Sequence, residues 1–198
     1  MKNSDYKDDV PVGFRCAPSW FDNEANLNSL GRIVQHYIKK YRPDARRELE
    51  SFRRAKSLRE AIQHAGMAIN FDSDKFPHQW RLSDSALQKA TTELTKVIHK
   101  IKVCRKFQDL IGLVQSTAGA VKGIGELYVY DTSLRIGAHL GVYPDEVYLH
   151  RGTRVGATAL RLIVDRPSIP VNEFPRELRQ LEPHEIEGVL CIYKARFS

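Results

Sequence analysis

Apolar residues recur at three- and four-residue steps along most of this chain. The first such run consists of Leu27, Leu30, Val34, Tyr37, Ile38 and Tyr41. Residues with this spacing fall on one face of a helix. Comparable runs cover residues 44–68, 83–101, 107–119, 126–140, 144–163 and 183–193. The pattern therefore predicts a mainly α fold, a single domain of about seven helices.

Several helix ends carry recognisable signals. Ser83 or Asp84 can cap a helix, because a short side chain with an oxygen accepts a free amide hydrogen of the first turn. Gly141 stands where a left-handed residue closes a helix, and Pro144 and Pro183 stand where helices begin. Only short segments such as Ile163-Val164 suggest a strand.

The domain prediction follows from length and composition. The chain has 198 residues, 42% of them hydrophobic, which suffices for one packed core. We expect a flexible N-terminal arm at residues 1–19 and one helical domain at 20–198. Within that domain, residues 20–82 are expected to form an N-terminal helical layer packed on residues 83–198.

Other function classes have little support in the sequence. No apolar run approaches the roughly 20 residues that a membrane helix requires. The polar N-terminus lacks the apolar stretch of a secretory signal, so we expect a cytoplasmic protein. The widely spaced Cys16, Cys104 and Cys191 have no zinc-ligand spacing and are expected to be reduced thiols. We predict no metal and no cofactor.

Charge shifts the interpretation towards a polyanionic partner. The net charge is +7 and the pI is about 9.4. Such a charge attracts polyanions, and salt weakens the attraction. The charged side chains of residues 39–59 are both basic and acidic. Those of residues 96–106 are all basic: Lys96, Lys100, Lys102, Arg105 and Lys106.

The glycine pair in Lys122-Gly123-Ile124-Gly125 suggests a place for a phosphate. Without β-carbons the backbone can turn sharply, and its amides can approach a bulky anion. A predicted helix follows at once, so its first unpaired N–H groups would face the same anion. Ile124 is expected to plug the apolar seam between the flanking helices. The alternative is a tight turn between two core helices.

This stretch resembles the helix-hairpin-helix motif of DNA-repair and recombination proteins. The match covers about residues 105–141, with Val121 to Gly125 as the hairpin and Val129 at a position that is often a small apolar residue. In that family the hairpin amides bind the DNA backbone. The resemblance therefore implies sequence-tolerant contacts with the backbone of duplex DNA by Lys122, Gly123 and Gly125.

The following YDTSLRIGAHLG resembles the "VDTHV…R…RLG" stretch of helix-hairpin-helix DNA glycosylases, in which the aspartate is catalytic. Asp131 would be the counterpart of that aspartate. In those enzymes a whole helix separates the hairpin from the aspartate, whereas Asp131 comes only five residues after Gly125. Alternatively, Asp131 benefits from the helix dipole or pairs with Arg135.

Arginines in YLHRGTRVGATALRL form a second candidate phosphate contact. Arg151, Arg154, Thr158 and Arg161 are expected on one face of the predicted helix 144–163. Arginine forks bind phosphate in a bidentate manner, and together with Lys122 they would form a phosphate track. Otherwise they form a solvated face or pair with glutamates of the C-terminal segment: Glu177, Glu182, Glu185 and Glu187. Arg105, from the basic cluster at residues 96–106, is a further candidate for contact with nucleic acid.

Two histidines are further candidates. His78 lies beside Trp80 and Arg81 in FPHQWRL, either a packed corner with Trp80 buried or a loop that binds a phosphorylated or planar ligand. His150 is a candidate acid-base group without a visible partner. No Walker loop, GxSxG, HExxH or paired-carboxylate pattern is present.

Three functions are consistent with these features. The first is sequence-tolerant binding of nucleic acid, and of duplex DNA in particular. The second is a nucleic-acid-processing, glycosylase-like enzyme with Asp131 or His150 in a cleft. The third is a protein-interaction or homo-oligomerisation module that binds no nucleic acid.

Overall fold

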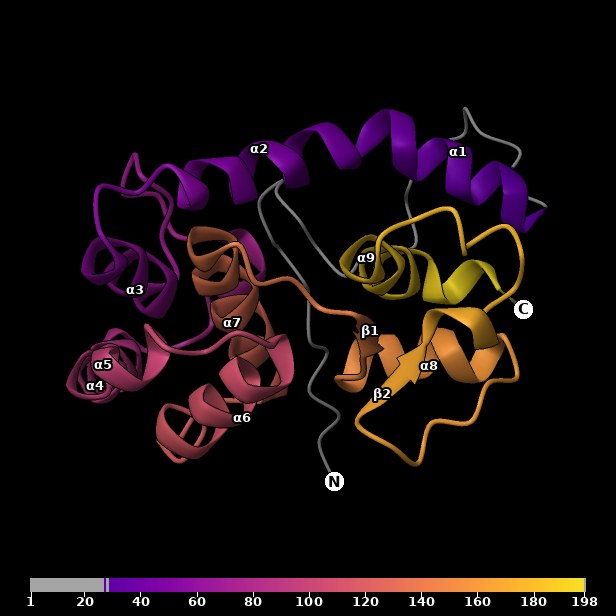
Figure 1. The fold of residues 1–198 in the computed structure, drawn as a ribbon. Coiled ribbons are helices and arrows are strands. Elements are labelled where there is room, and N and C mark those ends of the chain that lie inside the picture. The colour runs from indigo at the N-terminus through magenta and orange to yellow at the C-terminus, as the bar shows by residue number, and fades with distance from the viewer. Residues whose placement is uncertain (1–26, 28, 198) are drawn as a thin grey trace, which may run out of the picture.

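The computed structural model describes residue 27 and residues 29–197 (Figure 1). The predicted arm at residues 1–19 lies outside this part. The described residues form nine α-helices, three short 3-10 helices and one two-stranded antiparallel sheet. The prediction of a mainly α fold is confirmed, with more helices than expected.

The larger group of helices, which we call the helical lobe, lies on the left of Figure 1. It is built from α2 (Arg42–Arg53), α3 (Leu58–Met67), η1 (Pro77–Gln79), α4 (Asp84–Lys96), α5 (Ile98–Ile101), α6 (Phe107–Thr117) and α7 (Glu126–Leu140). Helix α7 packs against α2, α3 and α6. Phe52, Leu87 and Leu110 are among the fully buried residues of this lobe.

The second group, the sheet lobe, has a separate apolar core. Its elements are α1 (Leu30–Lys40), β1 (Glu146–Tyr148), α8 (Arg151–Ala159), β2 (Ser168–Pro170), η2 (Val171–Glu173), α9 (Pro183–Tyr193) and η3 (Lys194–Arg196). Val34, Val147 and Leu190 are buried together there. Helices α1 and α2 follow each other along the top of Figure 1 and connect the two lobes.

Local signals placed several helix ends correctly. The Ser83 hydroxyl accepts the N–H of Ala86 at 3.3 Å and caps α4. Helix α7 covers the predicted residues 126–140, and Gly141 follows it in the left-handed conformation, with φ 71°. Helix α9 begins at Pro183 as expected.

The helix predicted at residues 144–163 is wrong in its first half. Val147 of β1 pairs with Ile169 of β2, and α8 begins only at Arg151. The strand suggested at Ile163-Val164 is also wrong, because the second strand lies at Ser168–Pro170. Pairing with a distant segment satisfies the β1 backbone, and this pairing outweighs the local helical spacing.

Two other predicted helices are each divided. The run 44–68 forms α2 and α3, because the Ser57 hydroxyl accepts the N–H of Glu60 and starts a new helix. The run 83–101 forms α4 and α5, separated at Val97, whose backbone leaves the helical conformation. These divisions explain the additional helices.

A close contact between α8 and α9 sets the geometry of the sheet lobe. A β-carbon at Gly156 of α8 would lie 2.4 Å from the carbonyl oxygen of Leu190 of α9. Only glycine allows the two backbones to approach so closely. This approach brings the beginning of α8 next to the middle of α9, where the site described below is formed.

Candidate functional site

The predicted hairpin is an exposed turn between α6 and α7. Gly123 adopts φ 94°, a backbone conformation that residues other than glycine rarely adopt. Ile124 packs on the core of the helical lobe, and its N–H donates to the carbonyl of Val121 at 3.0 Å. Lys122, Gly123 and Gly125 are exposed. Within the described part of the chain, their N–H groups have no hydrogen-bond acceptor.

The structure places one predicted arginine beside this hairpin. Arg154 lies with Nη2 4.0 Å from Oε1 of Glu126, the first residue of α7. Its Nη1 donates to the carbonyls of Val164 at 2.7 Å and Arg166 at 3.0 Å. Arg154 is therefore partly occupied by backbone contacts. Arg151 is exposed one turn earlier on the same helix.

The other two candidate arginines, Arg105 and Arg161, have no such contact with the beginning of α7 among the described residues. Arg105 precedes α6 whereas the hairpin follows it, so roughly 16 Å of helix separates them. Arg161 lies beyond the end of α8 with φ 60°, so it cannot share a helix face with Arg151 and Arg154 as predicted. The predicted phosphate track is thus divided.

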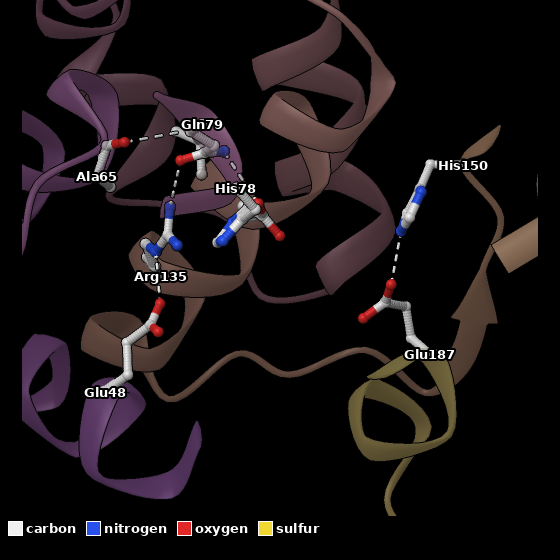
Figure 2. A network of polar contacts seen from close by, with 9 residues as sticks. Glu48, Ala65, His78, Gln79, Arg135, His150 and Glu187 are labelled. Carbon is white, nitrogen blue, oxygen red and sulfur yellow. Dashed lines mark hydrogen bonds and ion pairs between the residues drawn. The ribbon is translucent and has the colours of Figure 1, made fainter. Parts of the chain in front are cut away.

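Asp131 is the centre of a polar network on the inner side of α7. Its Oδ2 accepts hydrogen bonds from Nε2 of His78 at 2.7 Å and from Nε2 of Gln79 at 2.9 Å. The Gln79 Oε1 accepts from Nη1 of Arg135 at 3.0 Å, and the Arg135 Nε donates to Glu48 at 2.7 Å. Figure 2 shows Glu48, His78, Gln79 and Arg135 converging from α2, η1 and α7.

The environment of Asp131 favours its charged form. Burial alone raises the pKa of a carboxyl group, but the neighbouring His78 and Arg135 outweigh this effect and lower the pKa of Asp131. Asp131 is therefore ionised at neutral pH. The alternative prediction of a direct pair with Arg135 is not what the structure shows, because Arg135 bonds to Glu48 and Gln79 instead.

His150 has a partner that the sequence did not reveal. Its Nε2 lies 2.5 Å from Oε1 of Glu187 on α9, as Figure 2 shows. Its Nδ1 accepts the N–H of Gly152 at 3.2 Å and caps α8. Burial disfavours the imidazolium, but the hydrogen bond and charge of Glu187 prevail, so the pKa of His150 is raised. His150 and Glu187 thus form a nearly buried acid-base pair.

A cavity of about 130 Å³ lies between the lobes, and we call it the interlobe cavity. Elements of both lobes line it. The lining comprises Tyr37, Ala45, Glu48, Leu49, His78, Leu127, Asp131, Leu134, Arg135, His184, Glu187, Gly188, Cys191 and Ile192. Asp131 and the Glu187 partner of His150 therefore face the same space, although they lie on different lobes.

Other expectations about these residues are not met. Trp80 is 48% exposed rather than buried in a packed corner, whereas its neighbour His78 points inwards to Asp131. Within the described part of the chain, no candidate arginine pairs with the C-terminal glutamates. Arg42 and Arg46 bind Glu185 instead. Glu48, Gln79 and Glu187 were not singled out from the sequence as site residues.

One group of metal-ligand type occurs among the described residues. Ligand atoms of His150, Glu187 and Cys191 lie within 4.8 Å of one another. Cys191 is disulfide-bonded, so the expectation of a reduced thiol is wrong here and its sulfur is no thiolate ligand. Two remaining ligands that already bond to each other do not make a metal site.

Comparison with known proteins found no matching family model, no matching curated protein and no matching solved structure. Among the helices of the described residues, none has the length and apolarity needed to cross a membrane.

Proposed function

We propose that this protein binds nucleic acid through backbone phosphates with little dependence on sequence. The observation that supports this most directly is the exposed hairpin, whose amides at Lys122, Gly123 and Gly125 have no acceptor among the described residues. Helix α7 has no side-chain cap at its first turn. Unpaired amides at the start of a 15-residue helix are suited to a phosphate oxygen.

The surrounding charge is consistent with this proposal. Lys122 is exposed at the hairpin, Arg154 lies close to the beginning of α7, and Arg151 is exposed one turn earlier on α8. The exposed carboxylate of Glu126 acts against a phosphate there, although Arg154 lies near it. With α6 and α7 packed on either side, the arrangement is similar to a helix-hairpin-helix unit that holds duplex DNA by its backbone.

Salt dependence is the first test of this proposal. If about four phosphates are contacted, the affinity for duplex DNA falls roughly a hundredfold between about 50 and 200 mM salt. We expect Lys122→Glu to lower the logarithmic slope by about 1. Fluorescence anisotropy with unrelated duplexes of equal length measures both effects.

Lys56→Glu provides the matched control, because Lys56 is an exposed lysine in the turn before α3. The same charge change there should leave the slope unchanged. Absent binding, binding that does not respond to salt, or an equal effect of the two substitutions would each contradict the hairpin as the phosphate site.

A second candidate function, a nucleic-acid-processing enzyme, has separate support. Asp131 is ionised, bonds to His78 and lines a cavity. In addition, His150 bonds to Glu187, which lines the same cavity. Under this hypothesis Asp131 stabilises a cationic intermediate, and the pair of His150 and Glu187 transfers a proton.

Release of altered bases tests the enzyme hypothesis. Duplexes with a single uracil, 8-oxoguanine or methylated adenine are incubated with excess protein, and alkali converts each lost base into a strand break. We expect cleavage of at least one duplex, slowed about a hundredfold or more by Asp131→Asn. Asp109→Asn, an exposed acid on α6, is the control. Failure to cleave any duplex, or equal rates for both variants, would remove this function.

A further inference from the structure

The interlobe cavity contains more hydrogen-bond acceptors than the protein uses. Glu48, Asp131 and Glu187 come from α2, α7 and α9, and all three line the cavity. One oxygen of each carboxylate is already engaged. Glu48 accepts from Arg135, Asp131 accepts from His78 and Gln79, and Glu187 bonds to His150. The second oxygen of each carboxylate has no hydrogen-bond donor within the described ranges.

Two unpartnered imidazole nitrogens add to this arrangement. His78 and His184 both line the cavity, and the Nδ1 atom of each is buried without a hydrogen-bond partner in the described structure. A buried polar atom without a partner is costly, so native proteins rarely leave two beside one cavity. Burial lowers the pKa of His184, so this ring is neutral and does not cancel the carboxylate charge.

The balance of charge indicates the sign of the missing group. Three carboxylates line the cavity against the guanidinium of Arg135 and the His150 imidazole behind Glu187, whose pKa is raised, so negative charge remains in excess. An anion would be repelled there, whereas a group that carries N–H donors and positive charge would satisfy the unused oxygens. A shared metal ion is not indicated. Among the described residues, the group whose ligand atoms lie within 4.8 Å of one another consists of His150, Glu187 and Cys191, and it does not include Glu48 or Asp131.

The walls of the cavity suggest the rest of the ligand. Leu49, Leu127, Leu134 and Ile192 provide apolar surface between the polar groups. The volume of about 130 Å³ is similar to that of a cavity of about 150 Å³ that accepts benzene. A single ring or a short hydrocarbon therefore fits beside the charged group.

We propose that the interlobe cavity is a binding site for a compact organic amine or amidine. The cationic group lies among Glu48, Asp131 and Glu187, and the apolar body lies against the leucines of α2 and α7. The proposal is independent of phosphate binding by the hairpin, which lies outside this cavity.

Benzamidine and benzoate test the proposal, because they share a shape and differ in charge. We expect benzamidine to raise the melting temperature of the full chain and to bind in calorimetry at neutral pH, and benzoate to do neither. Ala45→Leu should abolish benzamidine binding, since Ala45 lines the cavity and the longer side chain occupies it. Equal effects of the two probes, or no binding of benzamidine, would overturn the proposal.

A second variant keeps the test decisive if Ala45→Leu does not fold. Glu187→Gln removes one charge and retains an oxygen for His150, so benzamidine should bind about tenfold more weakly. Glu177→Gln makes the same charge change at an exposed position outside the cavity and should not alter binding. An equal loss in both variants would overturn the proposal. Duplex affinity, measured in parallel, reports separately on the hairpin.

Discussion

Replacing Arg135 with alanine will lower the free energy of unfolding by about 3–5 kcal/mol. Arg135 is only 2% exposed, and its guanidinium binds Glu48 and the buried amide of Gln79. It also lies 3.6 Å from the centre of the Phe76 ring, which adds a cation–π contact. Truncation leaves the Gln79 amide, which is 2% exposed, without its donor and the partly exposed Glu48 carboxylate without its partner.

Chemical denaturation of the variant and the parent protein measures this loss. Arg53→Ala is the control, because Arg53 forms an exposed pair with Glu50 and its loss should leave the free energy of unfolding nearly unchanged. Adding Glu48→Gln to Arg135→Ala should cost less than the sum of the single changes, since both remove the same contact. A loss below about 1 kcal/mol for Arg135→Ala would show that the network does not stabilise the fold.

Features specified by neighbouring residues were predictable from the sequence. Ser83 caps α4, Gly141 closes α7 and Pro183 opens α9, and each needs only the first or last turn of its own helix. The predicted range of α7 was also correct. A helix end is a local hydrogen-bonding problem, so one side chain in the right place decides it.

The strands were not predictable in the same way. Val147 lies in β1 because Ile169 pairs with it, 22 positions further along the chain. The spacing of residues 144–163 alone favoured a helix, and Pro144 stands where such a helix would begin. A three-residue strand has too few positions to show an alternating pattern, so its assignment depends on a partner that local spacing does not identify.

The candidate site shows the same limit. Asp131 and His150 were singled out because each stands near a recognisable stretch of sequence. Their partners His78 and Glu187 lie 53 and 37 positions away, and only the packing of η1 and α9 brings them close. Asp131, His78 and His150 were thus each recognisable from the sequence, whereas the pairing of Asp131 with His78 and the role of Glu187 emerged only from the fold.

Replacing His150 with alanine will lower the free energy of unfolding by about 3 kcal/mol at pH 6. The side chain is 4% exposed, and its loss leaves Glu187, itself 12% exposed, without its partner. When the ring is neutral, its Nδ1 accepts the N–H of Gly152 and caps α8, a separate contribution of about 1 kcal/mol. Denaturation at pH 6 measures the loss of the charged pair, and a loss below about 1 kcal/mol would show that the pair is not stabilising.

The pH dependence of this loss identifies its electrostatic part. The folded-state pKa of His150 is raised above its unfolded value, so the charged pair contributes fully below about pH 6.5. That contribution disappears as pH rises through the folded-state pKa. The bond from Gly152 needs an unprotonated Nδ1, so it favours the neutral ring and limits the rise. The difference in free energy of unfolding between the parent protein and His150→Ala should therefore become smaller towards pH 9.

Two further variants separate this explanation from a general effect of pH on the fold. Glu187→Gln keeps an acceptor for the imidazole but removes the negative charge. The free energy of unfolding should therefore vary less with pH between pH 6 and 9 in this variant. His99→Ala changes an exposed histidine on α5 and should reproduce the parent profile. A profile that stays unchanged in Glu187→Gln would assign the pH dependence to groups other than this pair, because Glu187 supplies the largest favourable interaction of the imidazolium.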